Sequence, residues 1–156
     1  MEVDYINPIY AATSQVFKNM FQVEVEKGDL KIEEDIIPTQ EVNANIGVSG
    51  DLNGTIIYSF PEEMTLKIVE EMAGMEMEEV DKFVASAVGE LANIISGNAI
   101  SNYAEKNYDC DIIPPQVNVG EGTTYSTATD KTLVIPLSTS YGDFELNVSI
   151  GENKEE

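Results

Sequence analysis

The chain is organised around one long helical stretch, residues 80–106, VDKFVASAVGELANIISGNAISNYAEK. It contains no proline, and its apolar residues recur at three- and four-residue spacing, which is the pattern of an amphipathic helix. Its interior glycines, Gly89 and Gly97, are unusual because each costs about 1 kcal/mol relative to alanine in a helix. We therefore expect a close approach to the helix backbone here, either by another part of the fold or by a second protein.

Helices and strands flank this stretch in blocks. We expect one helix over residues 6–21 and another that begins at Pro61-Glu62-Glu63 and ends at Ala73-Gly74. The expected strands are residues 21–25, 41–50, 55–60, 116–119, 132–138 and 143–150, and residues 120–130 are either a loop or a weak edge strand. This order predicts an α+β fold, a mostly antiparallel sheet with two long helices packed on it. Residues 1–150 are expected to form a single domain and residues 151–156 a flexible C-terminal tail.

The charge balance narrows the choice of partners. The 156 residues include 29 acids and 8 bases, all of them lysines, for a net charge of −21. Phosphate backbones and anionic membranes would repel such a chain, so we expect neither as a partner. A protein with a basic rim would be attracted, although a merely soluble surface has the same composition. The chain lacks a run of about 18 apolar residues and a basic N-terminal region, which predicts a cytoplasmic protein without a transmembrane helix or signal peptide.

The residues that are missing exclude several mechanisms. Without histidine there is no Ser-His-Asp or Cys-His machinery, and without arginine there is no bidentate phosphate clamp. Cys110 is the only cysteine and has no basic neighbour, so we interpret it as an inert thiol. We expect no cofactor or metal to be bound by this chain. A carboxylate site for calcium or magnesium is the alternative, but no EF-hand spacing is present.

Four residues of the long stretch share one stripe of the helix because they are three or four residues apart: Ser86, Glu90, Asn93 and Gly97. The apolar residues expected to pack on the sheet from the far side are Phe83, Val84, Ala87, Leu91, Ile94 and Ile95. Three small residues flank the stripe and would let a second protein approach, namely Gly89, Ala92 and Ser96. The Glu-x-x-Asn spacing alone carries no information, since roughly 1.5 such pairs are expected by chance and one occurs.

The stripe resembles the signature of the CheC/CheX/FliY phosphatases, in which Asp or Ser is followed by Glu, then Asn, then a distal proline. Here Ser86, Glu90 and Asn93 are followed by Gly97 and by Pro114-Pro115. The similarity includes residues 52–60 and 112–115 and extends over about residues 41–150. The CheC branch carries two Glu-x-x-Asn motifs, whereas this chain carries one, which favours the CheX branch.

The resemblance implies a phosphatase that acts on a phosphorylated CheY-type response regulator, with magnesium on the partner. Asn93 would position the attacking water, because a carboxamide donates and accepts hydrogen bonds without adding negative charge. Glu90 would pair with the partner's active-site lysine, and Ser86 and Gly97 would lie at the interface. A homodimer joined by sheet edges is also implied, with residues 132–138 as a candidate edge strand. The alternative is a non-catalytic module that docks receiver domains in the chemotaxis or flagellar-switch apparatus.

Overall fold

The computed structural model describes residues 5–120 and 124–152, and for residues 34–38 and 124–131 it describes the backbone alone. The helices of this part of the chain are α1 (Ile6–Phe21), α2 (Glu62–Ala73) and α3 (Lys82–Glu105). Its strands are β1 (Glu26–Lys27), β2 (Lys31–Pro38), β3 (Val42–Gly50), β4 (Leu52–Phe60), β5 (Cys110–Val119), β6 (Thr124–Thr139) and β7 (Gly142–Glu152).

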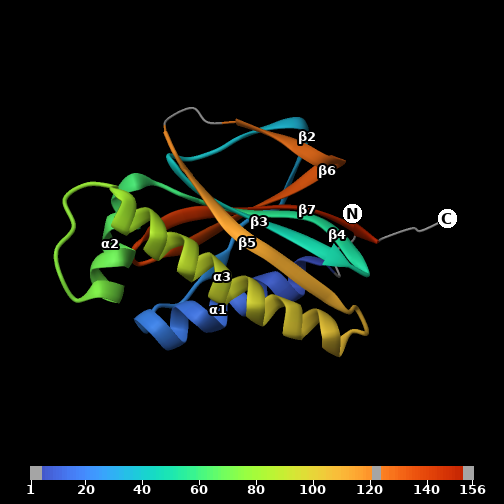
Figure 1. Ribbon diagram of the computed structural model, residues 1–156, viewed down its shortest axis with the longest axis horizontal. Helices are drawn as coiled ribbons and strands as arrows, with labels where there is room; N and C mark the ends of the chain where they lie inside the picture. The colour runs from blue at the N-terminus through green and yellow to red at the C-terminus, as the bar shows by residue number, and fades with distance from the viewer. Residues whose placement is uncertain (1–4, 121–123, 153–156) are drawn as a thin grey trace.

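The strands form one sheet in the order β1-β6-β7-β4-β3-β5, and β2 also pairs with β6. Every pairing is antiparallel. The helices lie on one side of the sheet, while β2 and the part of β6 that pairs with it rise on the other side (Figure 1). The predicted α+β fold is therefore confirmed, with the shorter helix α2 packed beside the two long helices.

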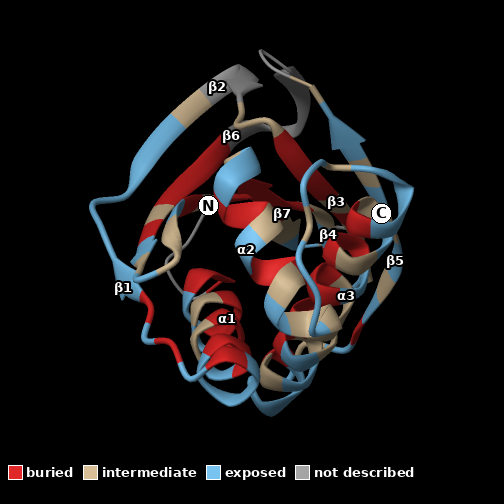
Figure 2. Cartoon of the chain, turned by 90° about the vertical axis from the view of Figure 1, so that its left-hand side faces the viewer, coloured by how far each residue is buried: buried red, intermediate tan, exposed pale blue. Residues whose placement is uncertain are grey.

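The core lies between the helices and the sheet, where the buried sides of both meet (Figure 2). Alternation decides which side of each strand faces the helices: β3 buries Val42, Ala44, Ile46 and Val48, as its sequence predicts. Stacked aromatic rings connect the layers, because Phe144 of β7 lies 5.2 Å from Phe17 of α1 and 4.9 Å from Phe60 of β4 between ring centroids. These contacts fix the helices on the sheet.

Several strand predictions were wrong in position. The strand expected at residues 21–25 is absent, because α1 continues to Phe21 and the next strand, β1, begins at Glu26. β2 was not anticipated. β5 begins at Cys110 and passes through Pro114-Pro115, where its register with β3 shifts. An outer strand tolerates prolines, since an N–H missing from its free edge breaks no ladder bond.

The ends of the sheet also differ from expectation. Residues 132–138 are not an edge, because β6 has β7 on one side and β1 and β2 on the other. Among the described strands, β5 has one neighbour, β3, and so forms an outer edge. β6 begins at Thr124, so most of the expected loop at 120–130 is strand, and residues 121–123 lie outside the described part. The expected tail does not begin at residue 151, since β7 continues to Glu152 opposite Leu52, and residues 153–156 are not described.

α3 departs from the expectation that no segment could span a membrane. In the described part of the chain it alone has the length and the apolar composition of a span, with a mean hydropathy of 1.3 over its best window. In the fold this helix packs against α1, β5 and β3. A helix that other elements cover on several sides also needs an apolar composition, because its buried side chains contact apolar neighbours in the protein.

Candidate functional site

α3 carries the predicted site and is fixed near both ends. Asp81 caps its N-terminus, where Oδ1 accepts the backbone N–H of Val84 at 2.9 Å. Near its C-terminus Asn102 Nδ2 donates to the carbonyl of Pro8 at 3.0 Å, and the hydroxyl of Tyr103 donates to the carbonyl of Tyr5. A helix held at both ends presents its side chains from a rigid support.

The structure brings three of the four stripe residues together in one groove. Ser86 and Glu90 are exposed, Asn93 is half-buried, and all three line a groove of about 490 Å³ between α3 and β5. The opposite wall comes from β5, namely Pro114, Pro115 and Val117. The distal prolines of the motif therefore meet its helical part in space. Gly97 is half-buried, lies one turn beyond Asn93 and does not line the groove.

Gly89 forms the floor of this groove, where α3 crosses β5 at close range. A Cβ at this position would lie 3.3 Å from Val117 Cγ2 and 3.6 Å from Pro115 Cγ. The first interior glycine is thus explained by helix–sheet packing, one of the two expected reasons. A Cβ at Gly97 would meet no atom of the described chain within 4 Å. Packing therefore gives no reason for the second glycine.

The helix is rotated relative to the orientation that the sequence predicts. The small residues Gly89, Ala92 and Ser96 are buried, and of these three Gly89 alone lines the groove, whereas Phe83 is 46% exposed. Ala87 and Ile94 are half-buried at the margin. The physical reason is distance, because α3 lies close to β5 and α1 and only small side chains fit between closely packed elements. The size of the side chains alone did not predict which face of α3 packs on the sheet.

A buried hydroxyl pair joins α3 to the sheet beneath the site. Tyr58 OH and Ser96 Oγ lie 2.8 Å apart, and burial raises the pKa of Tyr58, so that its hydroxyl stays protonated. We expect Tyr58→Phe to lower the free energy of unfolding by about 1–3 kcal/mol, because Ser96 would lose its partner in a buried position. Urea unfolding measures this. The double variant Tyr58→Phe/Ser96→Ala should recover part of the loss, and an unchanged single variant would contradict the prediction.

Other chemically capable groups lie away from the groove. Cys110 is buried, and burial raises the pKa of its thiol, which makes it a poor nucleophile as the sequence predicts. Among the side chains that the structure describes, no three from Cys, Asp or Glu converge as metal ligands would. The groove itself offers an amide, a carboxylate and a hydroxyl. It can hold a water or bind a cation of a partner, but it cannot supply a strong nucleophile.

Comparison with known proteins assigns the family. The model of the chemotaxis phosphatase CheX family matches residues 42–138, a range that contains the whole groove. The protein belongs to the CheX family. A protein named CheY-P phosphatase CheX from Thermotoga maritima is 28% identical over 152 residues, which cover 96% of this chain and 97% of the relative. The predicted resemblance is confirmed.

Solved structures of CheX proteins share the fold. Chemotaxis protein CheX from Vibrio vulnificus matches with a TM-score of 0.86 and 26% identity, covering 96% of this chain and 100% of that one. The CheX–CheY–BeF3–Mg2+ complex from Borrelia burgdorferi contains a match with a TM-score of 0.81 and 28% identity, covering 97% of this chain and 100% of the matched chain. The likeness therefore extends over nearly the whole chain, α1 and β7 included.

Proposed function

We propose that the protein is a phosphatase that accelerates hydrolysis of the aspartyl phosphate on a CheY-type response regulator. The observation that carries the proposal is that Glu90 and Asn93 both face one groove on the solvent side of α3. The Thermotoga maritima relative is named for this activity, and the Borrelia burgdorferi relative was crystallised with CheY, BeF3 and magnesium. The same class of partner suits a groove that lacks a nucleophile of its own.

Asn93 holds the attacking water in this proposal. An aspartyl phosphate is an acyl phosphate whose charge the receiver neutralises with its own magnesium and lysine, so the missing element is a water in line with the bond to be broken. The Asn93 carboxamide accepts one hydrogen bond from that water and donates another toward the phosphoryl oxygens. The water oxygen bonds to phosphorus, the bond from phosphorus to the aspartate oxygen breaks, and inorganic phosphate and a free aspartate carboxylate result.

Glu90 orients the two proteins. Its carboxylate is exposed one helical turn before Asn93, where it would repel a phosphoryl group unless it met a cation. Pairing with the receiver's active-site lysine supplies that cation and fixes the angle at which α3 enters. Ser86 and the Pro114-Pro115 wall lie beside it in the same groove and would contact the receiver around the phosphoryl group. Magnesium stays on the partner, and the reaction takes place in the cytoplasm.

The test measures the lifetime of a phosphorylated receiver. A CheY-type receiver is phosphorylated with a small-molecule phosphodonor in magnesium buffer, the donor is removed, and phosphate release is followed with and without the protein. We expect catalytic amounts of the protein to accelerate release. An unchanged or lengthened lifetime would contradict the phosphatase and would identify the non-catalytic docking module instead.

Gly97 provides a test in which stability and binding change in opposite directions. Gly97→Ala should stabilise the free protein by about 1 kcal/mol, because alanine is the better helix former and nothing in the described chain obstructs its methyl group. If the receiver approaches the backbone here, as the proposal holds, the same methyl group weakens binding. Thermal unfolding and a binding titration measure the two effects. Unchanged affinity would remove Gly97 from the interface.

We also propose that the protein is a homodimer joined at an outer edge of the sheet. β5 supports this, because β3 is its one neighbour among the described strands and because it carries exposed Ile113 and Val119. Sedimentation at micromolar concentration tests the proposal, and a monomer would contradict it.

A further inference from the structure

Two large apolar side chains, Phe83 and Met75, are exposed and precede the groove residues of α3 in the sequence. Phe83 lies seven residues before Glu90 and so belongs to the same face, one turn nearer the start of the helix than Ser86. Phe83 is 46% exposed, and Met75 in the preceding connection is 61% exposed. Met77 and Val80 lie half-buried in the same connection. Met77 and Val80 pack against the hydrophobic core, so the name Met75–Phe83 surface is used below for the two exposed residues, Met75 and Phe83.

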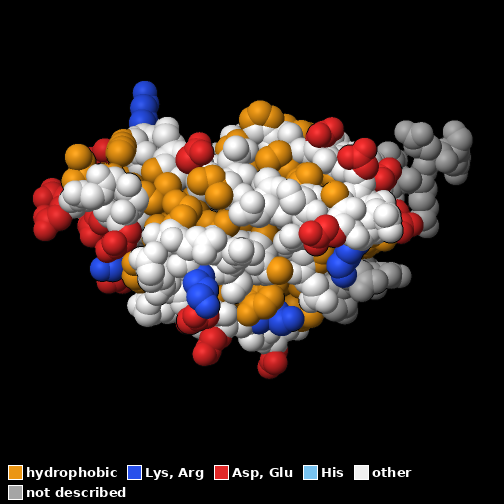
Figure 3. Space-filling model, turned by 90° about the horizontal axis from the view of Figure 1, so that it is seen from below, with side chains coloured by type: hydrophobic (Ala, Val, Ile, Leu, Met, Phe, Trp, Pro, Cys, Tyr) orange, Lys and Arg blue, Asp and Glu red, His pale blue; other side chains and the backbone are white. Residues whose placement is uncertain are grey.

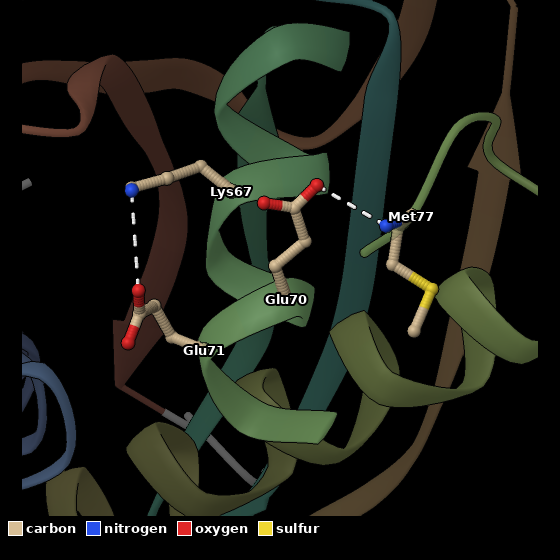
Figure 4. Close-up of polar contacts among 4 residues, drawn as sticks. All are labelled: Lys67, Glu70, Glu71 and Met77. Carbon is tan, nitrogen blue, oxygen red and sulfur yellow. Dashed lines mark hydrogen bonds and ion pairs between the residues drawn. The ribbon is translucent and has the colours of Figure 1, made fainter. Parts of the chain in front are cut away.

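The connection that carries this surface is fixed in place. α2 ends at Ala73 and is capped by Gly74, whose N–H donates to the carbonyl of Glu70 at 2.9 Å. Glu70 Oε2 then accepts the backbone N–H of Met77 at 3.1 Å, while the neighbouring Glu71 turns to the other side of α2 toward Lys67 (Figure 4). Asp81 completes the connection as the cap of α3. A segment tied down at its start, middle and end presents Met75 at a defined place.

Carboxylates surround the apolar residues. From Glu70 to Asp81, both included, the sequence has six acids and no base, and one base, Lys82, follows. The acids of the connection are exposed, namely Glu76, Glu78, Glu79 and Asp81. Figure 3 shows acidic side chains beside apolar ones at the end of the molecule where the α2–α3 connection lies. Apolar anchors inside a charged rim are the usual arrangement of a protein interface. The complementary partner has an apolar patch with a basic rim.

The size of the groove argues for a contact that extends beyond it. A stable protein interface covers about 800 Å² on each partner, which is more than a groove lined by eight residues provides. In the C-terminal direction the exposed residues of α3 after Gly97 are Asn98, Ser101, Ala104 and Glu105, none of which is large and apolar. In the N-terminal direction the exposed residues include two large apolar ones, Phe83 and Met75. Large apolar side chains that could anchor a partner therefore lie on the N-terminal side.

We propose that the Met75–Phe83 surface is the docking half of the receiver site, binding an apolar, basic-rimmed patch beside the phosphorylated aspartate. This inference rests on the proposed function. The groove residues Glu90 and Asn93 carry the chemistry and the orientation, while Phe83 and Met75 supply affinity and select the receiver. The acidic rim accelerates encounter with a basic patch.

The test separates affinity from turnover. We expect Phe83→Ala and Met75→Ala each to raise KM for the phosphorylated receiver by about tenfold, with turnover at saturation changed by less than about twofold. Ile32→Ala is the matched control, because Ile32 on β2 is also 61% exposed but lies away from the helix side of the sheet. It should leave both constants unchanged. Thermal unfolding of each variant verifies the fold.

A binding titration distinguishes the failure of this inference from the failure of the proposed function. The probe is a receiver activated with BeF3 and magnesium. If wild-type protein binds it and Phe83→Ala binds about tenfold more weakly, the docking surface stands even where no phosphate is released. Equal affinities of the wild type, Phe83→Ala and Met75→Ala would overturn the inference, as would a loss of turnover at unchanged KM.

A Glu76→Gln/Glu78→Gln/Glu79→Gln variant should lose most of the salt dependence of the association rate, and an unchanged dependence would remove the acidic rim from the interface.

Discussion

Asn93→Ala should lower the turnover of a phosphorylated receiver at saturation by about 10²-fold or more, while its affinity changes by less than about threefold. The carboxamide is expected to contribute position rather than binding energy, since water occupies the in-line site only when an amide orients it. Replacement by methyl leaves the helix and the groove wall unchanged, because Asn93 is half-buried at the groove margin and is not part of the hydrophobic core. Single-turnover dephosphorylation and a titration with BeF3-activated receiver measure the two quantities.

The matched control for this variant is Asn98→Ala. Asn98 is an exposed asparagine of the same helix and lies outside the groove, so its removal tests whether any amide on α3 affects the reaction. We expect full activity from Asn98→Ala. An Asn93→Asp variant should be as slow as Asn93→Ala or slower, because its carboxylate would repel the phosphoryl oxygens. Rapid dephosphorylation by Asn93→Ala would refute the assigned role.

Glu90→Ala should lower kcat/KM by a factor on the order of 10², through weaker binding and slower turnover together. The loss has two parts, because the receiver's lysine would be left without its partner and α3 would lose the contact that sets its angle. Stopped-flow dephosphorylation over a range of receiver concentrations separates these parts. This dual effect differs from the expectation for Asn93→Ala, in which only turnover falls.

Glu105→Ala controls for charge. It removes one carboxylate from an exposed position of the same helix, far along α3 from the groove. We expect its kcat/KM to stay within about twofold of the wild type at physiological salt, because exposed charges farther apart than about 8 Å are screened. Equal losses in Glu90→Ala and Glu105→Ala would show that net charge, rather than a specific ion pair, governs the encounter.

The local pattern of apolar and polar residues was sufficient to predict the helices and part of the sheet. The apolar spacing of α1, α2 and α3 and the alternation in β3 placed these elements to within a few residues. It was insufficient for β2 and for the early part of β5, since Pro114-Pro115 argues against a strand unless that strand lies at an edge. Edge status depends on partners that lie far away in sequence, as the interior position of residues 132–138 also demonstrates.

The sequence predicted that the candidate site residues share one face of a helix, but it did not predict what surrounds them. Spacing alone puts Ser86, Glu90 and Asn93 on one face of a helix, and the structure lines a single groove with them. The exposure of Phe83 was missed, because a large aromatic residue beside an apolar stripe is ordinarily assigned to the core. The signal that could have found it was its position seven residues before Glu90.

The sequence by itself determined the α+β class, the helical stripe and the absence of histidine and arginine chemistry, because these follow from composition and from a period of about 3.6 residues. Only the tertiary structure decided how α3 is rotated. Gly89 and Ser96 fit where the helix lies close to β5 and bonds to Tyr58, and that packing turns Phe83 outward with Glu90. Periodicity fixes which residues share a face, whereas the distance between packed elements selects the face that is buried.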